Sequence, residues 1–275
     1  MDWIDFRTIL ITALVFIPLE RLLALHMEQK IFRKHWLSDV FYLIFNGIPV
    51  KLGLLVVFGI TLFLIKIWVP EFVEAYVCSQ PVWLQTIEVL IIADIGFYLA
   101  HRAFHKFPFL WRFHSIHHSI EEMDWLAAHR VHPVDQVLTN SMSMVPVFAL
   151  GFSTTSIGIY VVIYHWFSML IHSNTKFKFG IFKWLFSTPQ FHHWHHANHK
   201  EAYDKNFAAL LPVLDILGGT LHMPGNSLPE KYGTDDPVPT RIDQQMIYPF
   251  LPPQQEVDEG EGDDLQDQPS RKSAG

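Results

Sequence analysis

The sequence predicts an all-α integral membrane protein: three N-terminal transmembrane helical elements and a helical hairpin, capped by a cytoplasmic histidine-rich helical domain. Three observations predict this fold. Half of the 275 residues are hydrophobic and only 17% are charged, whereas about 25% is typical of soluble domains. Long apolar stretches recur along the chain, and most of the 17 histidines cluster between them.

Residues 8–25 form the first apolar stretch. The segment before it, MDWIDFR, carries two acids and one base. A secretory signal peptide begins with a basic segment, so we expect a retained helix here. The second stretch, residues 40–69, has 30 residues, more than the roughly 20 that span a bilayer. Asn46, Gly47 and Pro49 predict a kink within it.

Two further apolar stretches follow. Residues 83–100 form a third span, in which Glu88 and Asp94 should face other helices or a cavity rather than lipid. Residues 134–172 comprise 39 residues, too many for one straight span. We therefore expect a helical hairpin that turns near Gly151–Ser156 and returns the chain to the side it left.

The positions of the basic residues predict how these spans are oriented in the membrane. The basic residues follow the first stretch and the third, whereas the expected loop over residues 70–81 has two acids and no base. The positive-inside rule then places the segments after the first and third stretches in the cytoplasm, and the N-terminus outside. The basic residues in question are Lys30, Arg33, Lys34, Arg102, Lys106, Arg112 and Arg130.

Four sets of histidines carry the chemistry. They are His101 and His105 in HRAFH, His114, His117 and His118 in HSIHH, His172 in IHSN, and His192, His195 and His196 in HHWHH. Residues at i, i+3 and i+4 share a helix face, so each HxxHH set can present three imidazoles together. Imidazole is the commonest metal-ligating side chain. Nine such groups exceed the four to six ligands or so that one metal takes, so the pattern predicts two metal ions.

The membrane topology brings all four sets to one face, because the hairpin returns His172 to the cytoplasmic side. The roles of His129, His132 and His165 stay open between metal ligand, hydrogen-bond partner of a ligand and structural residue. His193 lies off the face of its set, which favours a structural role.

At these residues the chain resembles the fatty acid hydroxylase/sterol desaturase family of integral-membrane oxidoreductases. The resemblance covers about residues 84–233. The run from Ser187 to His196, followed by Lys205-Asn206-Phe207, is also similar to alkylglycerol monooxygenases. The matching motifs, in order, are HRAFH, FLWRFHSIHHS, HPVD, IHSN, STPQFHHWHH, KNFAALLPVLDILGGT and PEKYG.

The resemblance implies an O2-dependent enzyme with two iron ions that hydroxylates or desaturates a lipid, such as a fatty acyl chain, a sterol or an alkylglycerol. It assigns no catalytic residue besides the metal ligands. Carried over by motif, these ligands are His101, His105, His114, His117, His118, His172, His192, His195 and His196.

Several neighbouring residues have two interpretations each. Asp94 and Asp135 either orient a ligand imidazole by hydrogen bonding or form structural pairs. Four aromatic residues near the ligands either line the entrance for substrate or belong to the core and the interfacial belt. These aromatic residues are Phe113, Trp125, Phe191 and Trp194.

A lipid from the bilayer is the expected substrate. The sequence has no GxGxxG motif followed by a ribose-binding acid, no CxxCH and no ferredoxin-like cysteine set. Electrons should therefore come from a separate cytochrome b5-like or ferredoxin-like protein. Lys106, Arg112, Arg130 and Lys200 either receive this acidic carrier or are solvated. With a net charge of -7, the chain has no basic footprint for a nucleic acid.

We expect three regions: transmembrane helices over residues 1–82, a catalytic region over 83–233 and an acidic, disordered tail over 234–275. Within the tail, residues 254–267 carry seven acids and no base, a composition typical of disorder.

Two other functions compete with the oxygenase. A metal transporter should hold its ligands near mid-membrane on discontinuous helices, but only His26 and His35 precede His101, and both lie in the first loop. A zinc-dependent membrane hydrolase needs three protein ligands for one catalytic zinc. Nine histidines exceed that number, and no HExxH glutamate accompanies them. Dependence on O2 and reductant separates the oxygenase from both.

Overall fold

The computed structural model describes residues 6–65, 69–225 and 227–252. Over these ranges the chain forms helices and loops and has no β-strand, only two isolated bridges, Ala24–Thr175 and Ala197–Tyr232. The all-α prediction is therefore confirmed. The prediction of disorder over 234–275 is wrong for residues 242–250, which form short helices, because Gln245 there is buried and accepts a hydrogen bond from the Tyr42 hydroxyl at 2.9 Å. The acidic run at 254–267 lies outside the described residues.

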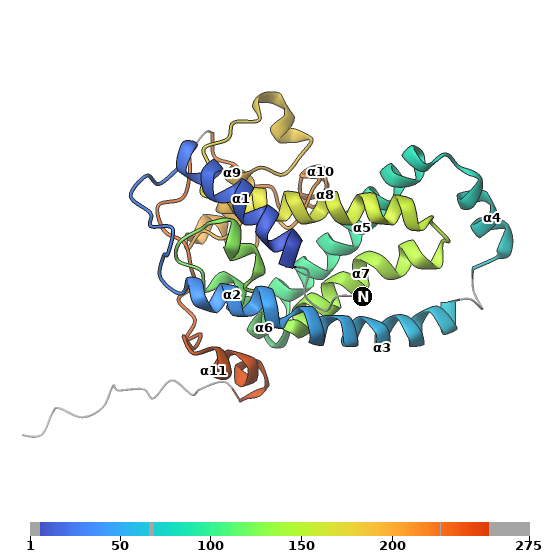
Figure 1. The fold of residues 1–275 in the computed structure, drawn as a ribbon, viewed down its shortest axis with the longest axis horizontal. Helices are drawn as coiled ribbons and strands as arrows, with labels where there is room; N and C mark the ends of the chain where they lie inside the picture. The colour runs from blue at the N-terminus through green and yellow to red at the C-terminus, as the bar shows by residue number, and fades with distance from the viewer. Residues whose placement is uncertain (1–5, 66–68, 226, 253–275) are drawn as a thin grey trace, which may run out of the picture.

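The long helices make the frame of the molecule. They are α1 (Phe6–Leu22), α2 (Trp36–Phe45), α3 (Gly47–Ile65), α5 (Val82–Lys106), α7 (Pro133–Ala149) and α8 (Thr154–His172). Helix α7 packs against both α3 and α5, and α8 packs against α5. In Figure 1, α3, α5, α7 and α8 run side by side toward the end of the molecule that carries α4 (Glu71–Ser79).

Most of the shorter elements lie away from α4, in the half of the molecule where Figure 1 also draws α1 and α2. Here the histidine motifs meet. The elements are α6 (Pro108–His118), η1 (Trp125–His129), η2 (Gly180–Trp184), α9 (Pro189–His195), η3 (Lys200–Ala202), α10 (Val213–Gly218), α11 (Ile242–Ile247) and η4 (Tyr248–Phe250).

Two described helices, α5 and α8, are each long and apolar enough to cross a membrane. The α2–α3 pair makes a third candidate if it counts as one span, bent by 42° at Asn46, where the sequence predicted a kink. Helix α1 has 17 residues, fewer than the roughly 20 that a span needs. The predicted hairpin is confirmed: α7 and α8 are joined at residues 150–153, where Gly151 has a φ of +80°.

The prediction of a loop over residues 70–81 is wrong, because this segment contains helix α4. Pro70 precedes the helix in an extended conformation, and Glu71 and Glu74 lie in its first turn. Acidic side chains at this end interact favourably with the helix dipole. Glu71 and Glu74, which we assigned to a loop, thus belong to the first turn of a helix.

Helices α5 and α7 approach each other closely at Gly96. A Cβ atom added there would overlap with the backbone oxygen of Met142. A side chain at position 96 would therefore push the two helices apart. Their contact aligns the C-terminal part of α5, which carries His101 and His105, with the start of α7.

Candidate metal centre

Four helix ends bring the histidines together. His101 and His105 lie in the last turns of α5, and His172 is the last residue of α8. The first HxxHH set occupies the end of α6, and the second occupies α9 with its C-cap, His196. Thr188 begins α9 by accepting a hydrogen bond from the N–H of Phe191, as an N-cap threonine does.

The nine histidines form two groups. His101, His105, His114, His118 and His195 make the first, and His117, His172, His192 and His196 make the second. Within each group, one ring nitrogen per residue lies within 4.8 Å of all the others. Almost all of these side chains are buried, and His105 is half-buried.

Each HxxHH set is divided between the two groups, so the expectation that one face presents three imidazoles to one place needs correction. Residues four apart on a helix differ by about 40° in direction, whereas residues at i+3 and i+4 differ by about 100°. His114 and His118 therefore point to the first group, while His117 points to the second. In α9 the pair four apart, His192 and His196, joins the second group, and His195 joins the first.

The Nε2 atoms of neighbouring rings approach one another closely. In the first group His101 and His114 are separated by 2.9 Å, and His118 and His195 by 3.0 Å. In the second group the Nε2 of His172 lies 3.2 Å from that of His117 and 2.8 Å from that of His192. Two ligands at right angles, each about 2.1 Å from a metal, lie about 3.0 Å apart. The separations are therefore those of adjacent ligands on one ion.

Hydrogen bonds from the Nδ1 atoms, which point away from the centre of each group, determine which nitrogen of each imidazole carries the proton. The Nδ1–H groups of His101, His117 and His195 donate to the backbone oxygens of Phe207, Arg130 and Lys205, at 2.8, 3.1 and 2.8 Å. That of His172 donates to Ser168 O at 2.6 Å. A neutral ring with its proton on Nδ1 has a bare lone pair on Nε2, so these Nε2 atoms face inward as acceptors.

Acceptor atoms that face each other at this distance fit a cation between them. His101 and His114 cannot share a hydrogen bond when both carry their proton on Nδ1, and the same holds for His117 and His172. The Nε2 of His105 is buried without any hydrogen-bond partner. This donor set of neutral nitrogens suits iron, copper, nickel or zinc.

Burial keeps the rings outside the membrane-spanning helices neutral. Loss of hydration lowers the pKa of His195 to about 3, and lowers the pKa of His117, His118, His192 and His196 well below the ordinary value. Neighbouring histidines repel the charged form further. Metal ligation requires the neutral ring, so the rings are ready to bind without losing a proton near pH 7.

The two carboxylates that the sequence singled out have different roles. Asp135 accepts from the Nδ1 of His114 at 2.7 Å and from the Thr139 hydroxyl at 3.1 Å. It therefore orients an imidazole of the first group, one of the two roles that we considered. Asp94 instead accepts from the backbone N–H groups of residues 209–211, at 2.7 to 3.0 Å, and its role is structural.

Asp215 is a site residue that the sequence analysis missed. Its carboxylate accepts from the N–H groups of Phe207 and Ala208, both at 2.8 Å. Together with Asp94 it holds the segment whose Phe207 carbonyl oxygen contacts His101. The motif KNFAALLPVLD contains both Phe207 and Asp215, so the signal was present there.

The histidines whose roles stayed open divide as follows. The Nδ1 of His132 caps α7 by accepting from Val134 N–H, and His193 bridges the Tyr232 hydroxyl and the Ser173 carbonyl oxygen. Both are structural. His129 and His165 belong to neither group, and each has a buried Nε2 without a partner.

The four aromatic residues belong to the core, one of the two interpretations that we considered. None of them lines the cavity described below, and Phe113, Trp125, Phe191 and Trp194 are all buried. Among the four basic residues, Arg130 is buried against Asp39, and Arg112 donates to the backbone oxygens of Tyr248 and Leu251. Only Lys106 and Lys200 are exposed.

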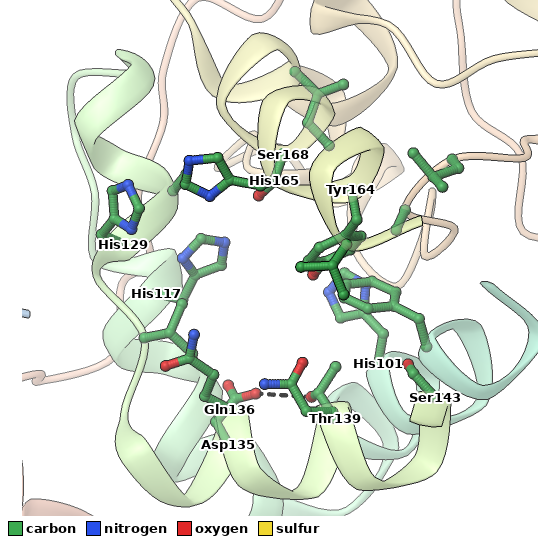
Figure 2. Close-up of a pocket in the computed structure, with 18 of the residues that line it drawn as sticks. His101, His117, His129, Asp135, Gln136, Thr139, Ser143, Tyr164, His165 and Ser168 are labelled. Carbon is green, nitrogen blue, oxygen red and sulfur yellow. Dashed lines mark hydrogen bonds between the residues drawn. The ribbon is translucent and has the colours of Figure 1, made fainter. Parts of the chain in front are cut away.

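A cavity of about 380 Å³ adjoins both groups, and we call it the central cavity. Its walls include His101 and His114 of the first group and His117, His172 and His192 of the second. Figure 2 shows His117, His129 and His165 on one side of it, and His101, Tyr164 and Ser143 on the other. Its apolar lining comes from α3, α5, α7 and α8, with Leu54, Phe58, Phe97, Met144, Tyr160 and Val161. It has the size of a small-molecule site.

Comparisons with known proteins agree with this site. Residues 86–220 match the model of the fatty acid hydroxylase family. No solved structure matches the chain significantly.

Three relatives have known activities. The ornithine lipid hydroxylase OlsE of Rhizobium tropici is 29% identical over 171 residues, which cover 62% of this chain and 51% of that protein. Human alkylglycerol monooxygenase is 27% identical over 147 residues, 54% of this chain and 32% of that protein. The very-long-chain aldehyde decarbonylase GL1-1 of Oryza sativa subsp. japonica is 32% identical over 136 residues, 46% of this chain and 21% of that protein. The match thus spans about half or less of each relative.

The matched region begins early in α5 and ends just after α10, and it contains all nine histidines, Asp135 and Asp215. Through this region the chain belongs to the fatty acid hydroxylase family.

Proposed function

We propose that this protein is a membrane-bound lipid hydroxylase that uses two iron ions, O2 and electrons from a separate protein. The observation that carries the proposal is the two groups of inward-facing Nε2 atoms beside one apolar cavity. His101, His105, His114, His118 and His195 would hold one ion, and His117, His172, His192 and His196 the other. The relatives with lipid hydroxylase and monooxygenase activity support this choice.

The proposed reaction converts R–H, O2, two electrons and two protons into R–OH and water. Bound iron would supply the activation of O2, which side chains do not supply. The chain's own residues hold the ligand rings at fixed orientations through Phe207, Arg130, Lys205 and Asp135. The apolar walls of the central cavity bind the alkyl part of the substrate and exclude water from it.

We further propose that the metal groups lie at the cytoplasmic membrane face, with the N-terminus outside. The asymmetry of basic residues supports this orientation. The three-region organisation of the chain stays part of the proposal: residues 1–82, 83–233 and 234–275. A cytochrome b5-like or ferredoxin-like donor would approach the cytoplasmic face, where Lys106 and Lys200 are exposed.

The test compares total lipid extracts from cells that express the wild type or a His117→Ala/His195→Ala variant, with and without O2. This variant removes one ligand from each group. His199→Ala is the matched control, because His199 is exposed and belongs to neither group. Wild type and control should both produce lipids heavier by one oxygen atom, only with O2 present, and the double variant should produce none.

Metal analysis of the purified proteins accompanies this test. We expect two iron ions per chain in the wild type and loss of metal in the double variant. Lipids lighter by two hydrogens would identify a desaturase instead. Tightly bound zinc without any O2-dependent product, in a host supplied with both kinds of electron donor, would contradict the proposal and favour the hydrolase.

A further inference from the structure

Outside the two histidine groups, three residues that line the central cavity each have a buried polar atom without a partner. These atoms are the Nε2 atoms of His129 and His165 and the Oε1 atom of Gln136. They come from three elements, η1, α8 and α7, and Figure 2 shows all three residues on the side of the cavity where His117 lies. A buried polar atom without a hydrogen bond is costly, so three along one side of one cavity indicate a missing polar partner.

The charges around the cavity restrict what this partner is. Among the described residues that line it, the only Asp, Glu, Lys or Arg is Asp135. Both oxygens of Asp135 are already bonded, one to His114 and one to Thr139. The wall therefore offers no cationic side chain to a phosphate or carboxylate and no unengaged carboxylate oxygen to an ammonium group, and any positive charge would come from ions held by the histidine groups. The three unpartnered atoms are themselves neutral hydrogen-bonding atoms, which fit an uncharged polar group.

The hydrogen-bonding capacity restricts it further. Gln136 Oε1 only accepts, so the partner must donate an O–H or N–H. An imidazole Nε2 either donates or accepts, depending on the tautomer. A hydroxyl or a secondary or primary amide satisfies all three atoms in turn, whereas an ester, an ether or a plain hydrocarbon offers Gln136 no donor.

The cavity also fixes which end of a lipid lies near the metal groups. Gln136 lies in the first turn of α7, and Met144 lies two turns further along, about 12 Å away by helix rise. His165 and Ser168 are likewise nearer than Val161 to the His172 end of α8. The three unpartnered atoms thus lie toward the histidine groups, and the lining further along α7 and α8 is mostly apolar, with Asn140 and Ser143 as polar members.

We propose that His129, His165 and Gln136 bind an uncharged hydroxyl or amide group of the lipid substrate, so that carbons close to this group face the metal groups. This inference rests on the proposed function for the nature of the occupant as a lipid. It assigns to the three residues a role in positioning the substrate, and it predicts oxidation near the polar group rather than at the far end of the chain.

The test measures binding without turnover. Purified, iron-loaded protein in detergent micelles is dialysed to equilibrium, without O2 or reductant, against 1-hexadecanol, hexadecanamide, hexadecane or palmitate, and partition into empty micelles is subtracted. We expect the wild type to bind the alcohol or the amide about tenfold more tightly than hexadecane, as one buried hydrogen bond provides. In variants of the three residues, palmitate binding should change less than the binding of the alcohol or the amide.

The variants are Gln136→Leu, His129→Phe and His165→Phe, each close in volume to the original side chain. Met144→Leu is the matched control, since Met144 lines the apolar part of the same cavity. Each polar variant should lose most of the preference for the alcohol or amide while it retains the binding of hexadecane and the iron content. Met144→Leu should keep the preference.

Two outcomes would overturn the inference. One is a wild type without preference for the polar probes. The other is a set of variants that bind hexadecane normally and keep the full preference, which would mean that ordered water satisfies the three atoms. Hexadecane binding reports an intact cavity, so a misfolded variant is recognised and replaced by Gln136→Met or His165→Leu. Because no turnover is measured, failure of the oxygenase proposal is seen separately, in the lipid extracts.

Discussion

Groups that accept a hydrogen bond from the Nδ1–H of a ligand imidazole influence how tightly that imidazole binds metal. Asp135 is the clearest case, because its carboxylate holds the Nδ1–H of His114 at 2.7 Å and both side chains are buried. A carboxylate in this position fixes the ring and makes its other nitrogen more basic. The remaining contacts to Nδ1 come mostly from backbone carbonyl oxygens, which substitution cannot remove.

Asp135→Asn should weaken metal binding by about 10- to 100-fold, because the amide keeps the shape but loses the negative charge. Metal affinity is measured by competition with a chelator. Thr139→Val is the control, since it removes only the partner of the other oxygen. Equal metal affinities in Asp135→Asn and the wild type would show that the carboxylate does not tune the site.

His129 makes the stability of the metal-free protein depend on pH. Burial lowers its pKa to about 4, from an unfolded value of about 6.5. Between these values the unfolded chain binds the proton and the folded chain does not, so stability falls as the pH falls from 6.5 to 4 and is fully present above 6.5. His129→Phe should reduce this fall by on the order of 1–3 kcal/mol. Unfolding of both proteins at pH 7 and pH 4.5 checks this, and an identical loss in the two would contradict it.

At the scale of elements, the site depends on where helices end and how closely they approach. The ligands sit on the last turns of α5, α6 and α8 and throughout α9, so a small shift of one helix moves several rings. The close contact of α5 with α7 at Gly96 sets the position of His101 and His105 on one side and of Asp135 on the other.

Gly96→Ala should destabilise the protein by about 1–3 kcal/mol, as overpacking does, and should lower the metal content. The added Cβ would collide with the Met142 backbone oxygen. Gly158→Ala is the matched control on α8, where a Cβ meets nothing within 4 Å, and there alanine should be neutral or slightly stabilising. Thermal unfolding in detergent micelles measures both. A stable Gly96→Ala protein with full metal content would contradict the close approach.

At the scale of the whole molecule, a buried ion network joins the N-terminal region to the histidine region. Arg33 contacts Asp39 at 2.6 Å and Asp124 at 2.7 Å, and Arg130 pairs with the same Asp39. All four side chains are nearly inaccessible. Since the carbonyl oxygen of Arg130 contacts His117, the network connects the loop before α2 to a ligand of the second group.

Arg33→Met should cost about 3–5 kcal/mol of folding free energy, because it leaves Asp124 buried without its cation. The neighbouring Lys34→Met removes an exposed pair with Glu121, which should cost at most about 1 kcal/mol. Chemical unfolding in micelles compares the two variants. Similar small losses in both would mean that the network does not hold the regions together.

The sequence by itself determined the helical class, the kink at Asn46, the hairpin and the four histidine sets, because apolar periodicity and i, i+4 spacing are local properties. The sequence analysis assigned residues 70–81 to a loop and missed the short helix there, because the same polar residues occur in loops and in the first turn of a helix. Only the tertiary structure decided the partition of the nine histidines into groups of five and four. Helix spacing fixes the angle between rings on one helix, but partners such as His118 and His195, 77 residues apart, meet only through the packing of different helices. The same packing places Asp135, and not Asp94, in contact with a ligand imidazole. It also places the unpartnered polar atoms of His129, His165 and Gln136 at one largely apolar cavity.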